Sequence, residues 1–179
     1  MNTRMEPFTL VVPVDRTDHV LGPEAARVVV VEYGDFECPS CRQAYPAVKQ
    51  LLQHFEHRIR YAFRHFPLTE VHPHAQLAAE AAEAAGAQHK FWPMHDTLFE
   101  HQPHLKDKDL RRYAETLELD LERFDYELAD QVYRQRVNEH IEGGRQSGVR
   151  ATPTFFVDGA IVDVSFGLQH LFEAVKTRL

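Results

Sequence analysis

The feature that most restricts this chain is a Cys-x-x-Cys motif, Cys38-Pro39-Ser40-Cys41, that follows a short apolar run, Arg27–Tyr33. The run is rich in β-branched residues and only a few residues long, which predicts a buried strand that ends at Gly34-Asp35. Apolar residues then recur at helical spacing from Cys41 to Phe55. A cysteine pair at such a strand-to-helix junction is either a redox centre or part of a metal site, and the motif favours redox.

The chain has two cysteines, and both belong to this motif. A secreted domain held by disulfides usually has more cysteines, spread along its sequence. The N-terminus of a helix carries a partial positive charge and unpaired N–H groups, which stabilise a thiolate at Cys38. Cys41 lies one turn deeper and can resolve a mixed disulfide on Cys38. Pro39 suits the first helical turn, where its missing N–H loses no partner.

Two further residues strengthen the redox interpretation. Glu32 is a lone carboxylate on the apolar run, and burying it is unfavourable unless it is paired or protonated. It either reaches water at a strand edge or acts as a buried proton acceptor for Cys41. Thr152-Pro153 precedes a second apolar run, where the proline either marks the start of a strand or forms a cis peptide.

The order of predicted elements is βαβ, a helical block, a β-hairpin and a final helix. Asp158-Gly159 is a strong hairpin signal. Pro46 is predicted to kink the helix in which it lies. The expected strands are Phe8–Val14 (a possible short strand), Arg27–Tyr33, Ile59–Phe66, Thr154–Val157 and Ala160–Val164. The expected helices are one from Cys38, His74–Gln88, one opened by Pro93 and running to His101, one capped by Asp107, one capped by Asp120, Gln131–Gln146 (ending near Gly143, Gly144 and Gly148) and one from Leu168.

In this order, the motifs resemble the thioredoxin superfamily and, within it, the bacterial DsbA-like proteins. The segment from Val31 to Cys41 is similar to that family's strand, loop and active-site helix, and Thr152-Pro153-Thr154-Phe155-Phe156 to its cis-proline loop. The resemblance implies an α/β thioredoxin fold with an inserted α-helical domain. The expected division is a lead-in over 1–18, a thioredoxin-like domain over 19–67 plus 146–179, and an inserted helical domain over 68–145.

The same resemblance implies a role for each site residue. Cys38 is the expected nucleophile, Cys41 the resolving thiol, Glu32 the buried acid and Pro153 the cis-proline that faces the cysteines. The backbone at Thr152 is expected to hold an extended substrate segment as an added strand, beside Pro39 and Ser40. The expected partners are protein substrates with thiols or disulfides and an unidentified redox partner. The only redox group expected is the Cys38–Cys41 pair itself, without a further cofactor.

The chain departs from the DsbA pattern between and before the cysteines. Pro39-Ser40 stands where strongly oxidising members have Pro-His, which removes an imidazolium that would favour the thiolate. Glu37 adds a negative charge next to Cys38. Both changes predict a centre less oxidising than DsbA, whose potential is about −120 mV.

Charge and composition exclude several function classes. With 179 residues and a formal net charge of −7, the chain is expected to be one domain, or one domain with an insertion, without a basic surface for nucleic acid. Its longest uninterrupted apolar run, Val28–Val31, is too short to insert into a membrane. The first residues do not resemble a secretory signal, which favours the cytoplasm, or the periplasm if a signal sequence has been removed.

Histidines and aromatic residues in the helical block have less specific interpretations. His72 with His74, or His101 with His104, could complete a zinc site with the two cysteines. The scatter of histidines, including His89, His95 and His140, instead predicts surface residues, and no metal is expected. Phe91, Trp92 and Phe99 are predicted to be core, and Asp107 and Arg111 an i,i+4 pair on a solvated face.

Two other function classes remain. The chain could be a non-catalytic binding module or chaperone that keeps its thiols for regulation. It could also be a glutathione-dependent transferase, although Cys41 argues against that class, because relatives of that kind lack the second cysteine.

Overall fold

The computed structural model describes residues 8–179, so the first seven residues of the predicted lead-in lie outside the described part. Five strands form a sheet in the order β1-β3-β2-β4-β5. β2 (Val28–Gly34) and β3 (Ile59–His65) run parallel at its centre, and β1 (His19–Leu21) is antiparallel to β3. β4 (Thr154–Val157) is antiparallel to β2, and β5 (Ala160–Val162) is antiparallel to β4. This sheet confirms the predicted mixed α/β class.

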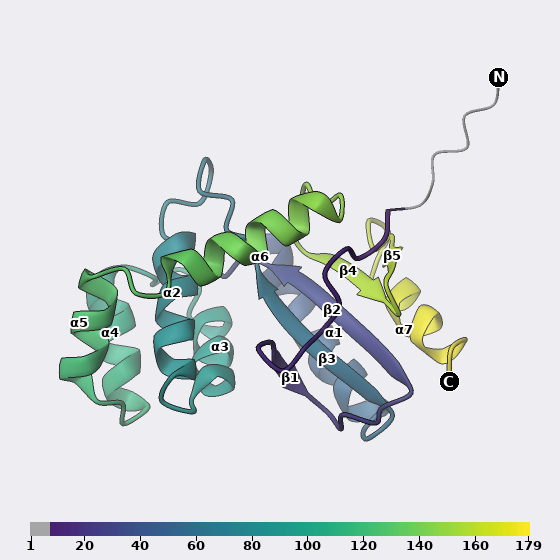
Figure 1. The fold of residues 1–179 in the computed structure, drawn as a ribbon, viewed down its shortest axis with the longest axis horizontal. Helices are drawn as coiled ribbons and strands as arrows, with labels where there is room; N and C mark the ends of the chain where they lie inside the picture. Colours follow the sequence, from purple (N-terminus) through teal and green to yellow (C-terminus); the bar gives the residue numbers. More distant parts are fainter. Residues whose placement is uncertain (1–7) are drawn as a thin grey trace.

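The helices lie on both sides of this sheet and beyond its end (Figure 1). α1 (Pro39–His54) joins β2 to β3 and continues through Pro46, and α7 (Gln169–Lys176) closes the chain. Between β3 and β4 the chain forms the predicted helical block: α2 (Ala75–Gly86), α3 (Phe91–Glu100), α4 (Asp107–Thr116), α5 (Leu121–Ala129) and α6 (Arg134–Gln146). α2 to α5 stand together at one side, and α6 runs back from them across the sheet to β4.

Strand direction places the two predicted active-site motifs together. Because β4 is antiparallel to β2, the end of β2 and the start of β4 lie at the same edge of the sheet. Cys38 follows β2 and Pro153 precedes β4, so segments more than 100 residues apart in the sequence meet at this edge.

The predicted strands β2, β3 and β4 are mostly buried and form the centre of the core. β2 is buried along almost its whole length because it lies between β3 and β4 and has helices on both faces. Phe91 and Phe99 are buried, and Trp92 packs against the same cluster, which confirms the prediction that these aromatic residues are core. None of the helices in residues 8–179 combines the length and apolar character needed to cross a bilayer.

Several local predictions are wrong at the ends of the chain and in the helical block. Phe8–Val14 forms one isolated bridge, Thr9 to Ala160, in place of a strand. The short strand β1 was not predicted, because its three residues gain their conformation from pairing with β3. α3 begins at Phe91, two residues before Pro93, and α6 begins at Arg134, because Gln131 has a positive φ of 53°.

The remaining differences concern contacts that sequence spacing does not reveal. Arg111 pairs with Asp125 of α5 at 3.0 Å, and not with Asp107. Asp107 is the first residue of α4, and the cap involves Asp109, which accepts from the Lys106 N–H at 3.2 Å. Asp120 caps α5 as predicted, through a bond from the Arg123 N–H.

Candidate active site

The two cysteines lie where β2 passes into α1. Cys38 is the N-cap residue of α1, with extended backbone angles, and Cys41 lies in the first turn. The Cys38 N–H donates to the Asp35 carbonyl, which closes the turn between strand and helix. Both side chains are free thiols; Cys41 is fully buried, whereas Pro39 and Ser40 between them are exposed. The dipeptide between the cysteines is therefore accessible from solvent.

The two thiols have opposite acidities. The pKa of Cys38 is lowered to about 5, first by a hydrogen bond from the Cys41 thiol and then by bonds to Thr152 and to the backbone N–H groups of Ser40 and Cys41. Burial raises the pKa of Cys41 well above its usual value. At neutral pH Cys38 is therefore a thiolate and Cys41 a thiol, which suits a nucleophile and a resolving thiol.

Glu32 points into the interior beneath this pair. It is 3 % exposed on a central strand, so the interpretation that it reaches water at a strand edge is wrong. Burial raises the pKa of Glu32 to about 7, and the hydroxyl of Tyr61 donates to its Oε2 at 2.6 Å. The Glu32 carboxylate in turn helps to raise the pKa of Cys41. A buried carboxyl group with a pKa near 7 can hold or release a proton near neutral pH.

The loop before β4 completes the site. The Thr152-Pro153 peptide is cis, which was one of the two interpretations drawn from the sequence. The Thr152 carbonyl lies 3.3 Å from Cys38 Sγ and accepts its hydrogen bond in the thiol form. The backbone that could hold a substrate strand is therefore in contact with the nucleophilic sulfur.

Several residues that support this site were not found from the sequence. Tyr61 lies on β3, and its partner Glu32 lies on β2. The Gln102 amide, from the loop after α3, donates to the carbonyls of Phe36 and Cys38, each at 2.8 Å. The Asp35 carboxylate accepts from the Leu68 N–H at 2.9 Å and lies 2.7 Å from His72 Nδ1. Glu32 itself was a signal for Tyr61, because a buried carboxylate needs a donor, but no signal indicated Gln102.

Glu37, expected to oppose the thiolate, is engaged elsewhere. Its carboxylate lies 2.8 Å from His74 Nδ1 and accepts from the His74 N–H at 2.7 Å. The acidity of Cys38 is high even with this carboxylate next to it.

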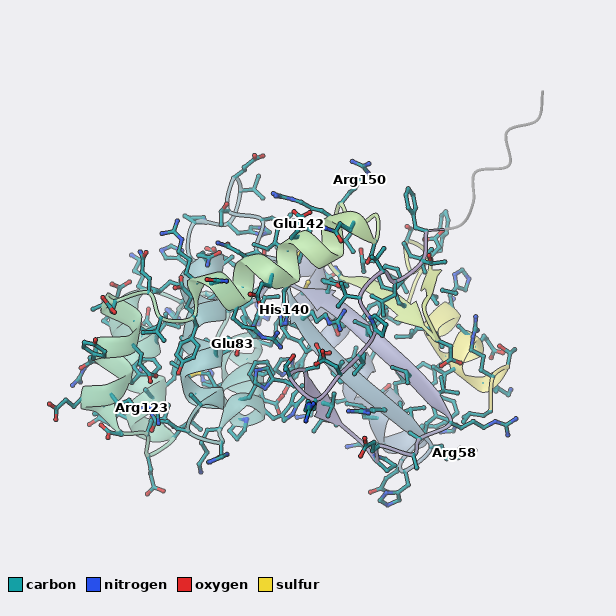
Figure 2. The ribbon with its side chains drawn as sticks, viewed as in Figure 1. Arg58, Glu83, Arg123, His140, Glu142 and Arg150 are labelled. Atoms are coloured by element: carbon teal, nitrogen blue, oxygen red, sulfur yellow. The ribbon has the colours of Figure 1, made fainter. Side chains whose placement is uncertain are left out.

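The prediction that the histidines lie on the surface is wrong for His95 and His140, which are buried. His65 and His140 face Glu83, and one ligand atom from each of the three lies within 4.8 Å of the others. Figure 2 marks Glu83 on α2 and His140 on α6. His65 Nε2 lies 2.8 Å from Glu83 Oε1, and His19 Nε2 lies 3.0 Å from Oε2. The backbone N–H of His65 donates to His140 Nδ1 at 3.1 Å. The neutral His140 ring therefore carries its proton on Nε2, and that atom has no lone pair to offer a metal.

This cluster is the one group in residues 8–179 with the residue types and spacing of a metal site, and it does not include the cysteines. His72, His74 and His101 bond to Asp35, Glu37 and the Thr97 carbonyl, so they do not complete a zinc site with Cys38 and Cys41. The His65–Glu83–His140 cluster instead links α2 and α6 to the sheet.

Comparisons with known proteins agree with this architecture. A family model described as thioredoxin matches residues 15–177. The oxidised form of BdbD from Bacillus subtilis matches with a TM-score of 0.85 and 22 % identity, over 97 % of this chain and 98 % of BdbD. A thioredoxin-like oxidoreductase from Silicibacter pomeroyi DSS-3 matches with a TM-score of 0.77 and 28 % identity, over 91 % and 92 % of the two chains.

Among curated sequences, Na+/H+ antiporter NhaA 1 of Salinispora arenicola (strain CNS-205) is 56 % identical over 169 residues. The match covers 94 % of this chain but 26 % of the antiporter, so the chain spans about a quarter of the length of the curated relatives it matches. The matches to BdbD and to the α-DsbA proteins of Wolbachia pipientis confirm the predicted DsbA-like fold with its inserted helices. The family model, which covers almost the whole chain, shows that the chain belongs to the thioredoxin family.

Proposed function

We propose that the chain is a thiol–disulfide oxidoreductase that exchanges disulfides with protein substrates through Cys38 and Cys41. The observation that carries the proposal is the opposite acidity of the two thiols, one ionised beside Thr152 and one buried and protonated. A purely structural pair gains nothing from this asymmetry, whereas an exchange reaction needs an attacking thiolate and a protonated reserve.

In the reducing direction, the Cys38 thiolate attacks one sulfur of a substrate disulfide. A bond forms between Cys38 and that sulfur, the substrate S–S bond breaks, and the departing substrate thiolate takes a proton from water. Cys41 then gives its proton to Glu32 and attacks Cys38 Sγ, which releases the second substrate sulfur as a thiolate. The product is the Cys38–Cys41 disulfide, so two electrons have passed to the substrate.

The reverse sequence oxidises a substrate dithiol with the same groups. We propose a potential between the reducing and moderately oxidising ranges, because the acidic Cys38 thiolate stabilises the reduced form. The absence of histidine between the cysteines limits that effect. A reduction potential measured in glutathione buffers, with free thiols counted by mass shift, gives the direction in which the pair runs.

The substrates we propose are extended protein segments. The main chain at Thr152 lies next to Cys38 Sγ, and Pro39 and Ser40, which follow Cys38 in the sequence, are exposed. A substrate segment that pairs with this main chain as an added strand is bound through its own backbone, so segments of many different sequences can bind.

The decisive test is a Cys41→Ser variant, which attacks substrates but does not resolve them. We expect it to accumulate mixed disulfides through Cys38 with an unfolded, disulfide-containing protein, whereas Cys38→Ser traps none. If Cys41→Ser traps no client and the wild-type chain neither reduces nor oxidises a test disulfide, the proposal is wrong. If Cys38→Ser also suppresses client aggregation as well as wild type does, the chain is the binding module considered above.

We further propose that one redox partner is a membrane transporter and that the chain works in the cytoplasm. Support for the first comes from the relatives, which are named Na+/H+ antiporters and are about four times as long as the matched segment. Support for the second is that both cysteines belong to the reactive pair, which leaves none for structural disulfides. Trapping with Cys41→Ser in cells, followed by fractionation against periplasmic and membrane markers, tests both.

A further inference from the structure

A groove lies beside the active-site loop that contains Thr152. It encloses about 1070 Å³ between the loop after β3 and one face of α6. Its apolar floor is formed by Phe66, Leu68, Ile141 and Val149, and three arginines line it: Arg134, Arg145 and Arg150.

The groove is continuous with the substrate-binding backbone. Val149 and Arg150 are separated by Ala151 alone from Thr152, whose carbonyl contacts Cys38 Sγ. The opposite wall is tied to the active site as well, because the Leu68 N–H donates to the Asp35 carboxylate. A segment held at Thr152 therefore enters the groove within a few residues.

The three arginines stand along the groove, and the Arg134 guanidinium also donates to Gln131 Oε1 at 2.8 Å. Arg134, Asn138, Ile141 and Arg145 recur at helical spacing on α6, and Arg134 and Arg145 are separated by about 16 Å along the helix axis. An extended segment of about five residues spans that length. All three arginines are exposed, and no ion pair in residues 8–179 involves any of them.

Two carboxylates, Glu70 and Glu142, also line the groove. The Glu142 carboxylate accepts from the Gln146 amide at 2.9 Å, and the three guanidinium groups outnumber the two acids. This local excess of positive charge stands against a formal net charge of −7 for the chain. Figure 2 shows Arg150 and Glu142 at the end of α6 nearest β4, and Arg58 at the far end of the sheet.

We propose that this groove, formed by the 66–71 loop and the Arg134–Arg150 side of α6, binds client segments that combine acidic and apolar residues near the reactive cysteine. The proposal rests on the exchange function and names its preferred substrates. The apolar floor receives alternate side chains of an extended segment, and the arginines bind the carboxylates between them.

The test compares reduction rates of three single-cysteine peptides of equal length. Each peptide carries its cysteine as a mixed disulfide with 2-mercaptoethanol, and it has leucine alternating with aspartate, lysine or serine on both sides. The reduced enzyme becomes the Cys38–Cys41 disulfide and releases the peptide thiol and 2-mercaptoethanol. Each rate is divided by the rate of the same protein with bis(2-hydroxyethyl) disulfide, which is small and uncharged.

We expect wild type to reduce the aspartate peptide about tenfold faster than the lysine peptide at low salt, and this preference to shrink as salt is added. The Arg145→Glu/Arg150→Glu double variant is expected to reverse the order. Arg58→Glu, the matched control on an exposed residue distant from the groove, is expected to keep it. Net charge alone predicts the opposite wild-type order, because an acidic protein attracts the lysine peptide.

Two results overturn the inference: no aspartate preference in wild type, or a preference that the double variant retains. In both cases the small disulfide is still reduced and the exchange function stands. If the small disulfide is not reduced either, the exchange function itself has failed.

Discussion

Cys38 and Cys41 are separated by two residues, yet their thiols differ in acidity because Cys38 is the N-cap of α1 and accepts several hydrogen bonds, whereas Cys41 is more deeply buried in the first turn. The hydrogen bond between them acts in both directions, lowering the pKa of Cys38 and raising that of Cys41. Glu32 lies on the strand below and shares their electrostatic environment. The chemistry of the site therefore depends on a few buried groups at short range.

The acidity of Cys38 depends first on the Cys41 thiol. We expect Cys38 to be half ionised near pH 5 in the reduced protein, since its pKa is lowered to about 5. Cys41→Ala removes the hydrogen bond and is expected to raise this pKa by about one unit or more, whereas Cys41→Ser keeps a hydroxyl donor and has a smaller effect. Absorbance of the thiolate at 240 nm against pH measures it. An unchanged titration in Cys41→Ala would show that the helix N-terminus acts alone.

Tyr61 is expected to set the pH at which Glu32 accepts a proton. Its hydroxyl bonds to the carboxylate and lowers the pKa of Glu32 against the effect of burial. Tyr61→Phe is therefore expected to raise the Glu32 pKa above about 7 and to shift the pH profile of mixed-disulfide resolution upward. Glu32→Gln removes this ionisation from the profile and serves as the reference. If Tyr61→Phe leaves the profile in place, Glu32 is not the proton acceptor.

Burial of Glu32 also has a consequence for stability. Its pKa is raised in the folded state, so its contribution is favourable at low pH and is lost as pH rises toward and through 7. Glu32→Gln is expected to increase the free energy of unfolding at pH 8 by about 3 kcal/mol and to have little effect at pH 4. Urea unfolding at the two pH values measures the difference. An equal effect at both values would assign it to packing.

At the scale of elements, α6 approaches the sheet closely enough to require glycine. The sequence predicts a helix that ends at about Gln146, near Gly143, Gly144 and Gly148; α6 does end at Gln146, and it runs through Gly143 and Gly144. A Cβ atom on Gly144 would lie 2.8 Å from the buried ring of Phe66 and 3.0 Å from Tyr33. These glycines therefore provide close packing and do not end the helix.

A matched pair of alanine substitutions tests this packing. Gly144→Ala is expected to lower the free energy of unfolding by about 1–2 kcal/mol, because the clash with Phe66 exceeds the gain in helix propensity. A Cβ atom on Gly143 would lie 3.3 Å from the exposed Val12 side chain and 3.6 Å from the Tyr33 hydroxyl, the second of which is an ordinary contact distance. Gly143→Ala is therefore expected to be neutral or to stabilise by up to about 1 kcal/mol. Thermal or urea unfolding distinguishes them. Equal effects of the two substitutions would contradict a close approach at Gly144.

At the scale of the whole molecule, buried histidines join the helical block to the sheet. Burial lowers the pKa values of His65, His95 and His140, so these rings stay neutral in the folded protein. The unfolded chain binds their protons below about pH 6.5, which makes acid destabilising.

His140→Gln is expected to reduce this acid sensitivity. The glutamine oxygen can accept the His65 N–H bond, and the variant lacks one group that titrates in the unfolded state. Below pH 6.5 the stability of wild type relative to the variant should fall by up to about 1.4 kcal/mol per pH unit. His104→Gln, at an exposed position, is the control and should follow wild type. Parallel stability curves for wild type and His140→Gln would contradict the expectation.

Local sequence signals determined much of this protein. The β-branched run before Cys38, the helical spacing after it and the Asp158-Gly159 turn act over a few residues, so β2, α1 and the β4–β5 hairpin could be predicted. The same signals predicted that Cys38 lies at a helix N-terminus. The resemblance to a known family predicted that Thr152-Pro153 faces it.

Other features were decided only by the tertiary structure, because they join segments far apart in the sequence. The three-residue strand β1 exists through pairing with β3, and the burial of His140 through the crossing of α6 over the sheet. Tyr61 bonds to Glu32, and Gln102 bonds to the active-site turn. The partners are far apart in the sequence, so no local residue pattern predicts these contacts. The sequence by itself singled out the Cys38–Cys41 pair. Long-range packing determined the acidity of the two thiols, the residues that support them and the arginine-lined groove, because those depend on which distant segments meet.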